Sequence, residues 1–512
     1  MSSDNPQTEI TPEDEFCLDV AGYLVVRGVL TGEEVAACNE AIDRVSKRDR
    51  MLEWESPWCD PFVRLNEHPI LTGYLDELCY LGYQLDRPPR LLDEEVAPAE
   101  PLGGGGEPRN WSGAYYCGND ARFTLGVRAI WALEDVAEGD GGFSLVPCSH
   151  KSFVETPSDV LDGRDDMGVT VQPALEAGDL VLTVATLLQG MRPWKGKAKR
   201  LLSTGYISRL VRRSNEAPAD DPEGPPQWVD EMTPEQRVIL GVDRPNPAPI
   251  VYSDGKRTWV GGEPGTYHPT TMIRDPECQI DEKEFYFWDL NGYLLVRNVM
   301  DEAWLAAANE AIDACADLIV KGGDISHGTK RLAGTAPSSL SGLFELPSPH
   351  AEPFRRMIAN PALVERLNWM SGSGFVVDAA RAIIYEKGTA GHGVHSGPYP
   401  GSARSIYAMQ NGRTYCETIN VAWQLRDVGA GDGGFFGIAG SHKTNHPVPE
   451  GVRSLEDERG LLRHVEMKAG DLVIFMGSAQ IHGAYPWQNE IPRRAVIFNY
   501  VSRNLEKPPK RS

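Results

Sequence analysis

Two histidines and a pair of arginines near the C-terminal end of the chain could together hold a metal ion and an anion. His395 lies in a Gly- and Pro-rich stretch, and His482 follows the apolar run Leu472–Phe475. Arg493 and Arg494 then precede the last apolar run. A non-haem iron centre uses two imidazoles, usually with a carboxylate, and leaves positions open for oxygen and a cosubstrate. A nearby guanidinium can bind the carboxylate of that cosubstrate in bidentate fashion.

Short β-branched and aromatic runs, bounded by Gly, Pro and Asp, predict the strands that would carry these residues. A β segment at 293–297 is followed by an amphipathic helix with Leu305, Ala308, Ile312 and Cys315 on one face. Helices followed by many short strands favour a mainly β fold with flanking helices, of the sandwich or jelly-roll type. The predicted strands are 418–423, 464–467, 472–475 and 495–500.

The chain also repeats itself. Gly22-Tyr-Leu-Val-Val-Arg27 returns as Gly292-Tyr-Leu-Leu-Val-Arg297, and Ser149-His-Lys151 returns as Ser441-His-Lys443. The repeated segments keep their order, which indicates duplication or fusion of one domain. We therefore predict two tandem double-stranded β-helix domains of the jelly-roll, cupin-like class. Their predicted bounds are 1–250, which includes a linker rich in Pro and Asp, and 279–512.

One block of the second copy resembles a known family. Residues 418–443, with a strand, then Gly-Asp-Gly-Gly-Phe, then Gly-Ser-His-Lys, resemble the phytanoyl-CoA dioxygenase family of iron- and 2-oxoglutarate-dependent oxygenases. The likeness extends over nearly all of 285–505, and a weaker form covers 15–210. By this match His395 and His482 are the iron ligands. Arg493, or Arg494 in its place, is the anchor for the 2-oxoglutarate carboxylate.

The resemblance implies an Fe(II)- and 2-oxoglutarate-dependent oxidoreductase of the hydroxylase type that acts on a small organic metabolite. One residue departs from the family, because Gly397 stands where the family has the Asp of its H-x-D pair. Chloride could take the open position, as in radical halogenases of the family. Glu417, Asp432 or a water could instead complete the metal shell. In a third reading the protein is a non-catalytic scaffold or binding protein.

The first copy lacks both imidazoles. Trp111 and Gln189 are expected at the positions of His395 and His482, while Arg200 remains near the position of Arg493. We therefore expect no catalytic iron in residues 1–250. This copy could brace the second domain, contribute to a pocket or mediate formation of a homodimer.

Further residues near the predicted strands could line the pocket, although aromatic residues there are more often core. His442 is read as a structural turn and His392 as a loop residue. The Gly-rich run 103–106 is read as a flexible loop. The pocket candidates are Gly397, Tyr399, Tyr407, Gln410 and Trp423, and the histidines read as ordinary surface residues are His327, His350, His446 and His464.

Composition narrows the class of partner. A formal net charge of −23 disfavours nucleic acid and anionic membranes as partners. The small-molecule substrate is what the family resemblance implies. The nine cysteines include no C-x-x-C pair, so we expect reduced thiols and a cytoplasmic location. The N-terminal residues are polar and acidic, unlike a signal peptide, and no apolar run approaches the ~18 residues that span a membrane.

Overall fold

The computed structural model describes most of the chain. We refer to residues 10–208 as the N-terminal half and to residues 281–502 as the C-terminal half; between them β10 (Ile250–Ser253) pairs with β11 (Lys256–Trp259). The described residues are 10–45, 50–79, 83–92, 101–104, 115–118, 121–208, 250–253, 256–259, 281–325, 329–371, 375–399, 401–410 and 413–502.

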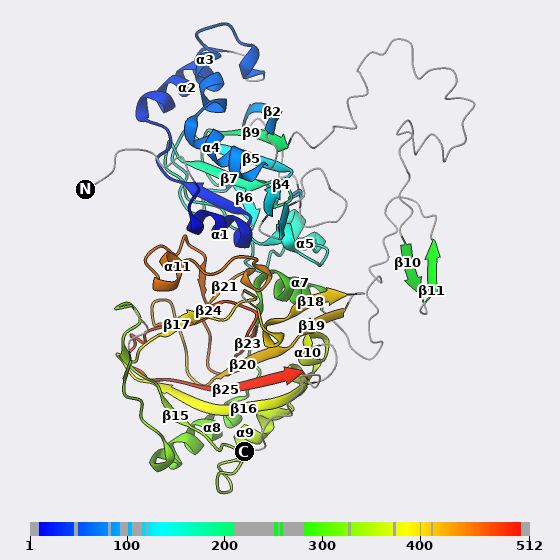
Figure 1. Ribbon diagram of the computed structural model, residues 1–512. Helices are drawn as coiled ribbons and strands as arrows, with labels where there is room; N and C mark the ends of the chain where they lie inside the picture. Colours follow the sequence, from blue (N-terminus) through cyan, green and yellow to red (C-terminus); the bar gives the residue numbers. More distant parts are fainter. Residues whose placement is uncertain are drawn as a thin grey trace.

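An antiparallel sheet of five strands forms the centre of the N-terminal half, in the order β1-β7-β5-β9-β2. A second, smaller sheet consists of β6 and β8, and helices cover the outer face of the larger one (Figure 1). The strands are β1 (Tyr23–Val26), β2 (Tyr83–Leu91), β3 (Tyr115–Gly118), β4 (Ala121–Thr124), β5 (Gly126–Ala132), β6 (Gly142–Val146), β7 (Leu180–Val184), β8 (Leu188–Arg192) and β9 (Leu201–Ser208). The helices are α1 (Pro12–Ala21), α2 (Gly32–Arg44), α3 (Asp60–Asn66), α4 (Pro69–Leu78) and α5 (Ser158–Asp162), with short 3-10 turns at Met51–Glu53 and Ser149–Lys151.

The C-terminal half has the same plan with additional strands in both sheets. Its large sheet has the order β12-β23-β20-β25-β16-β15, and a four-stranded sheet, β17-β24-β21-β22, faces it. The strands of these two sheets are β12 (Tyr293–Val296), β15 (Ser338–Leu340), β16 (Phe375–Tyr385), β17 (His392–His395), β20 (Thr418–Gln424), β21 (Gly434–Ile438), β22 (Leu462–His464), β23 (Leu472–Met476), β24 (His482–Tyr485) and β25 (Arg493–Ser502). Two further strand pairs are β13 (Asp324–Ile325) with β14 (Gly334–Thr335) and β18 (Tyr407–Gln410) with β19 (Arg413–Cys416). The helices are α7 (Glu282–Asn291), α8 (Glu302–Ala314), α9 (Glu352–Ile358), α10 (Pro361–Ser371) and α11 (Glu450–Ser454), with 3-10 turns at Ala316–Leu318, Ala403–Ser405 and Ser441–Lys443.

The alternation of side chains along β20 shows how the sequence builds two faces. Val421 and Trp423 belong to the core between the large sheet and its helices, together with Trp304 of α8. Ala422 points the other way, into the space between the two sheets, and so does Gln424, two residues further along the strand. Successive strand residues face opposite sides, so one strand serves both layers. The prediction of a mainly β chain with flanking helices is confirmed.

The first helix of each half ends in the same way. Gly22 follows α1 and Gly292 follows α7, both with φ 79°, a left-handed conformation that glycine adopts without strain. Added Cβ atoms there would lie 2.5 Å from Nδ1 of His150 and 2.8 Å from Nδ1 of His442. The repeated glycine and the repeated Ser-His-Lys motif are therefore parts of one packing unit. His442 lies in a 3-10 turn, as expected.

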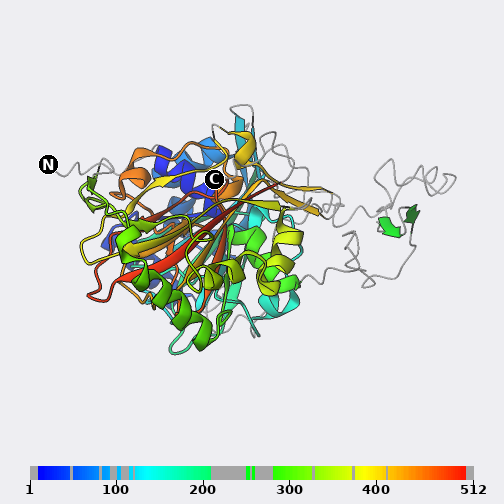
Figure 2. The same ribbon diagram turned by 90° about the horizontal axis from the view of Figure 1, so that it is seen from below.

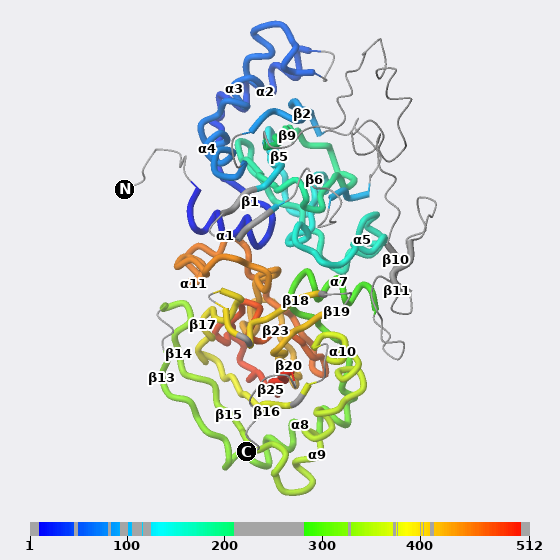
Figure 3. Tube along the Cα trace, turned by 45° about the vertical axis from the view of Figure 1, so that its right-hand side comes forward, coloured from blue at the N-terminus to red at the C-terminus, as the bar shows by residue number. Residues whose placement is uncertain are grey.

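Each half reaches into the other at the junction. In Figures 2 and 3 the segment around α11 lies against α1, and the segment around α5 lies against α7. Asp19 of α1 accepts hydrogen bonds from Thr444 Oγ1 at 2.8 Å and from Tyr115 at 2.8 Å. Asp289 of α7 accepts the equivalent bonds from Ser152 Oγ at 3.1 Å and from Tyr407 at 2.7 Å. The two aspartates thus hold the halves together through matching contacts.

Two further expectations concern the whole chain. None of the helices in the described ranges is both long and apolar enough to cross a lipid bilayer. The side chains of Cys117 and Cys278 lie outside the part of the chain that the structure describes. The free thiols are those of Cys17, Cys38, Cys59, Cys79, Cys148, Cys315 and Cys416.

Candidate metal centre

The structure brings together the two histidines that the sequence singled out. β17 and β24 pair in antiparallel fashion, with His395 directly opposite His482. Their ring centroids are 4.2 Å apart and the ring planes are inclined by 58°. The two strands bring residues far apart in the sequence to adjacent positions in one sheet.

Backbone carbonyl groups fix the orientation of both rings. Nδ1 of His395 lies 2.7 Å from the oxygen of Gly393, and Nδ1 of His482 lies 2.8 Å from the oxygen of Gln480. A carbonyl oxygen can only accept, so Nδ1 is the donor and Nε2 keeps the lone pair that a metal needs. Burial, reinforced by neighbouring His395, lowers the pKa of His482 to about 3, so its neutral form prevails.

A third imidazole lies close by. The ring centroid of His392, at the start of β17, is 4.3 Å from that of His395, so this residue belongs to the strand rather than to a loop. Even so, the described part of the chain contains no group of three or more His, Cys, Asp and Glu side chains arranged to hold a metal ion. Asp432 is bonded instead to Gly429 N and to Asn489 Nδ2, and Glu417 does not join the histidines either. The idea that one of these carboxylates completes the shell is not supported.

Gly397 could not be exchanged for a carboxylate residue without rearrangement. Its φ is +113°, and an added Cβ would lie 2.8 Å from Cγ1 of Ile481. The preceding Ser396 also has a positive φ of 68°. Residues other than glycine are strained in this conformation. The backbone conformation of this segment therefore disfavours a carboxylate residue at position 397.

The two neighbouring arginines have opposite surroundings. Arg493, the first residue of β25, is 3% exposed; its Nε is 3.4 Å from Gln424 Oε1, and its Cζ is 5.2 Å from the ring centroid of Tyr385. Within the described ranges no carboxylate forms a salt bridge with it, and burial lowers its pKa. Arg494 turns outward to pair with Asp313 of α8. A buried cation without an anion is a ready site for one.

Arg493 and His482 contact the same apolar lining. Phe435 and Phe475 lie between the two sheets, with ring centroids 6.0 Å and 4.9 Å from that of His482. Tyr385, which stacks with Arg493, belongs to the same cluster. Sequence reasoning missed Tyr385 and Gln424. The only signal for Gln424 was its place in the alternation of β20.

The corresponding place in the N-terminal half is closed. Gln189 of β8 accepts a hydrogen bond from Thr183 Oγ1 at 2.9 Å, and its amide nitrogen donates to the carbonyl groups of Val184 and Leu187. In the sheet Gln189 lies opposite Gly103 on one side and opposite Leu145 of β6 on the other. Trp111, expected opposite Gln189, lies outside the described residues. Gly103, in the run read as a flexible loop, forms the bridge to Gln189, while Gly105 and Gly106 lie outside the described residues.

Arg200, expected near the position of Arg493, matches the residue next to it. It binds Asn39 Oδ1 at 3.0 Å and Asp43 Oδ1 at 2.5 Å, on the outer side of the sheet. Arg494 makes the same contacts with Asn309 and Asp313. Arg200 therefore corresponds to Arg494 and not to Arg493.

Three of the other pocket candidates have surroundings of their own. Tyr399 is 53% exposed, and Tyr407 donates its hydroxyl to Asp289 at the junction. Trp423 is fully buried on the helix side of the large sheet, away from the space between the sheets. Gln410 is the last residue of β18. His327 lies outside the described residues.

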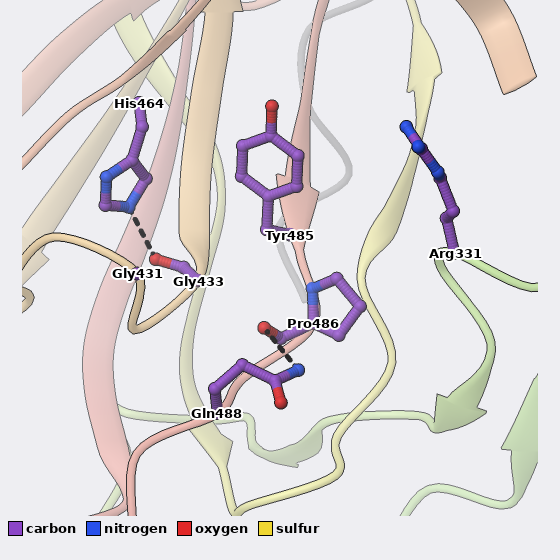
Figure 4. Close-up of a pocket in the computed structure, with 7 residues that line it drawn as sticks. All are labelled: Arg331, Gly431, Gly433, His464, Tyr485, Pro486 and Gln488. Atoms are coloured by element: carbon purple, nitrogen blue, oxygen red, sulfur yellow. Dashed lines mark hydrogen bonds between the residues drawn. The ribbon is translucent and has the colours of Figure 1, made fainter. Parts of the chain in front are cut away.

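An open pocket of ≈ 360 Å³ lies near the end of β24 (Figure 4). It contains neither of the paired histidines nor Arg493. Tyr485 faces it, and residues 482 and 485 point to opposite sides of the strand. His464, a surface residue by prediction, lies in its wall with Nε2 2.7 Å from the oxygen of Gly433. The lining residues are Arg331, Gly431, Gly433, His464, Tyr485, Pro486 and Gln488.

The chain was compared with curated proteins and with solved structures. No curated protein matches the chain. Solved structures with a similar chain include HygX from Streptomyces hygroscopicus with nickel and 2-oxoglutarate bound (16% identity, 44% of this chain, 88% of HygX, TM-score 0.37). They also include the non-haem α-ketoglutarate-dependent epimerase SnoN from nogalamycin biosynthesis (18%, 45%, 92%, 0.34) and AviO1 from Streptomyces viridochromogenes Tue57 (15%, 44%, 96%, 0.33).

A family model matches most of the C-terminal half. It covers residues 288–495, which include β17, β24 and the start of β25 with both histidines and both arginines. The matching model is that of the phytanoyl-CoA dioxygenase (PhyH) family.

Proposed function

We propose that this protein is an Fe(II)- and 2-oxoglutarate-dependent oxidoreductase that acts on a small organic molecule at a site in the C-terminal half. One observation carries the proposal. His395 and His482 face each other across β17 and β24, and backbone carbonyls bind Nδ1 of both rings, which supports Nε2 as the metal-binding atom. This is the arrangement in which outer hydrogen bonds prepare imidazole ligands.

Each residue has a defined task in this proposal. His395 and His482 hold the metal through Nε2, and Arg493 binds the far carboxylate of 2-oxoglutarate. A bound Fe(II)–2-oxoglutarate pair supplies the oxidising chemistry when oxygen is present. Phe435 and Phe475 exclude water from the space between the sheets, which strengthens the attraction between Arg493 and an anion. Gln424 orients the guanidinium through its side-chain carbonyl.

Hydroxylation of a C–H bond is the leading reaction. Halogenation is the second candidate, and the conformation of Gly397 favours it. With φ +113° and Ile481 against the missing Cβ, this position supplies no carboxylate, so an exogenous anion such as chloride could bind beside the two imidazoles. The alternative of a non-catalytic scaffold predicts neither metal binding nor turnover.

We also propose that the chain is a tandem pair, with residues 1–250 and 279–512 as its two domains. The same strand order in both large sheets supports this division. Gln189 with its amide fully engaged, opposite Gly103, supports a first domain without iron. The first domain then acts through contact with the second.

Anaerobic titration tests the function. The full chain is mixed with Fe(II) and 2-oxoglutarate, and the visible charge-transfer absorbance of the chelate is followed in the wild type and in His482→Ala. We expect the band in the wild type and its loss in the variant. Oxygen is then admitted with and without chloride, and succinate and any chlorinated product are measured across candidate substrates. A wild type that binds no Fe(II) and forms no succinate contradicts the proposal and leaves the scaffold reading.

A further inference from the structure

Helix α1 of the N-terminal half holds a segment of the C-terminal half, residues 450–461. Asp14, only 2% exposed, lies 2.5 Å from Nη1 of Arg459 through Oδ1. Glu13 accepts a hydrogen bond from Gly451 N through Oε1 at 3.2 Å. The segment begins with α11, which lies beside α1 in Figure 1. Two consecutive residues of α1 therefore fix both ends of this segment.

The same segment contacts both strands that carry the histidine pair. α11 packs against β17, whose last residue is His395. Glu458, adjacent to Arg459, accepts a hydrogen bond from the hydroxyl of Tyr485 at 3.3 Å. Tyr485 ends β24, the strand that begins with His482. A short path thus leads from α1 through 450–461 to each histidine.

Apolar packing follows the same route. Val394 and Ile481, each next to one of the paired histidines in sequence, are buried in a cluster that is otherwise centred on the N-terminal half. Buried side chains cannot shift without disturbing their neighbours, so this packing restricts β17 and β24. Members of the cluster from α1 are Phe16, Cys17, Leu18, Val20 and Ala21, and members from 450–461 are Val452, Leu455 and Leu461.

The contact between α5 and α7, on the other side of the junction, serves as a matched control for the contact between α1 and 450–461. Lys283 of α7 binds Asp159 of α5 at 2.8 Å and Asp165 at 2.5 Å. α5 packs through Val160 on Val146 and Leu188, in the half where Gln189 replaces the histidine. This contact therefore joins the halves without touching β17 or β24.

We infer that α1 and the segment 450–461 form a positioning element for the His395–His482 pair, so that the N-terminal half sets the order of the metal site. Arg459 and Tyr485 are its positioning residues. The expected effect on metal affinity rests on the proposed function, whereas the expected effect on the rigidity of β17 and β24 does not.

The test compares Arg459→Ala with Lys283→Ala in the full chain. Hydrogen–deuterium exchange is followed for the amides of 392–396 and 482–485, and Co(II) affinity is measured by calorimetry. We expect Arg459→Ala to speed exchange in both strands and to weaken Co(II) binding by about tenfold, as loss of outer-shell contacts does elsewhere. Lys283→Ala should leave both within about twofold. Tyr485→Phe, which leaves the junction ion pair in place, should speed exchange in β24.

The outcomes separate the two claims. If Arg459→Ala and Lys283→Ala give the same exchange in β17 and β24, the positioning element is ruled out, whether or not the wild type binds metal. If the wild type binds no Co(II) but exchange rises in Arg459→Ala alone, the positioning element stands and the metal function fails. Arg459→Lys, which keeps the charge, should restore part of the protection.

Discussion

Lys151 and Lys443 each donate a hydrogen bond to the backbone carbonyl of the other, at 3.1 Å and 3.0 Å. Each also pairs with an aspartate of its own half, Lys151 with Asp19 at 3.1 Å and Lys443 with Asp289 at 2.8 Å. The contacts are reciprocal, as in an interface between identical subunits related by a twofold axis. The repeated Ser-His-Lys motif therefore joins the halves.

Removal of one lysine should destabilise the whole chain. In Lys443→Met the carboxylate of Asp289, which is fully buried, loses its cation. An uncompensated buried charge costs about 3–5 kcal/mol, so the free energy of unfolding should fall by that amount in urea titration. Lys468→Met removes an exposed pair with Asp427 and should leave the free energy of unfolding nearly unchanged. Equal losses in the two variants would contradict the role of the junction.

Asp19 should make the junction sensitive to acid. Although burial alone would raise it, the pKa of Asp19 is lowered to about 2 by Lys151 and by hydrogen bonds from Thr444 and Tyr115. The folded-state pKa lies below the unfolded value of 3.8, so this stabilisation is complete above about pH 4 and is lost as pH falls toward 2.

The contribution of Asp19 at neutral pH is about 2 kcal/mol. The difference in free energy of unfolding between wild type and Asp19→Asn should therefore shrink as the pH falls from about 4 toward 2, measured by urea titration at each pH. A difference that stays constant over this range would show that Asp19 is not held as the charged form.

Substitution of Arg493 should weaken 2-oxoglutarate binding, whereas substitution of Arg494 should not. Arg493→Gln removes a buried guanidinium without a carboxylate partner, so 2-oxoglutarate affinity should fall by about 100-fold in calorimetry. Arg494→Gln breaks the outward pair with Asp313 and should alter the affinity by less than about threefold. Equal losses of 2-oxoglutarate binding would mean that the anchor is not Arg493.

Gly397→Asp should not restore a metal-binding triad. The backbone at φ +113° and the contact with Ile481 should cost about 1–3 kcal/mol of stability without a gain in Co(II) affinity. Gly397→Ala should cost a similar amount, because the strain comes from Cβ. Tighter metal binding by the Asp variant would show that the segment rearranges and that the position is an ordinary ligand site.

The fold and part of the site could be predicted because their signals are local. Short β-branched runs predicted the strands, and motif order with the family resemblance proposed His395, His482 and either Arg493 or Arg494. Pairing registers were less accessible, since they depend on which strands meet. The pairing of Gly103 with Gln189 is one such register. Arg200, expected near Arg493, makes the contacts that Arg494, the next residue after Arg493, makes in the C-terminal half.

The sequence by itself determined a mainly β chain of repeated motifs, with two histidines and an arginine spaced for a metal and an anion. Only the tertiary structure decided that Arg493 turns inward and Arg494 outward, since one register shift reverses every side chain on a strand. It also decided that Arg459 and Asp14, 445 positions apart, meet at the junction. Such contacts have no local signature, because packing of the two halves creates them.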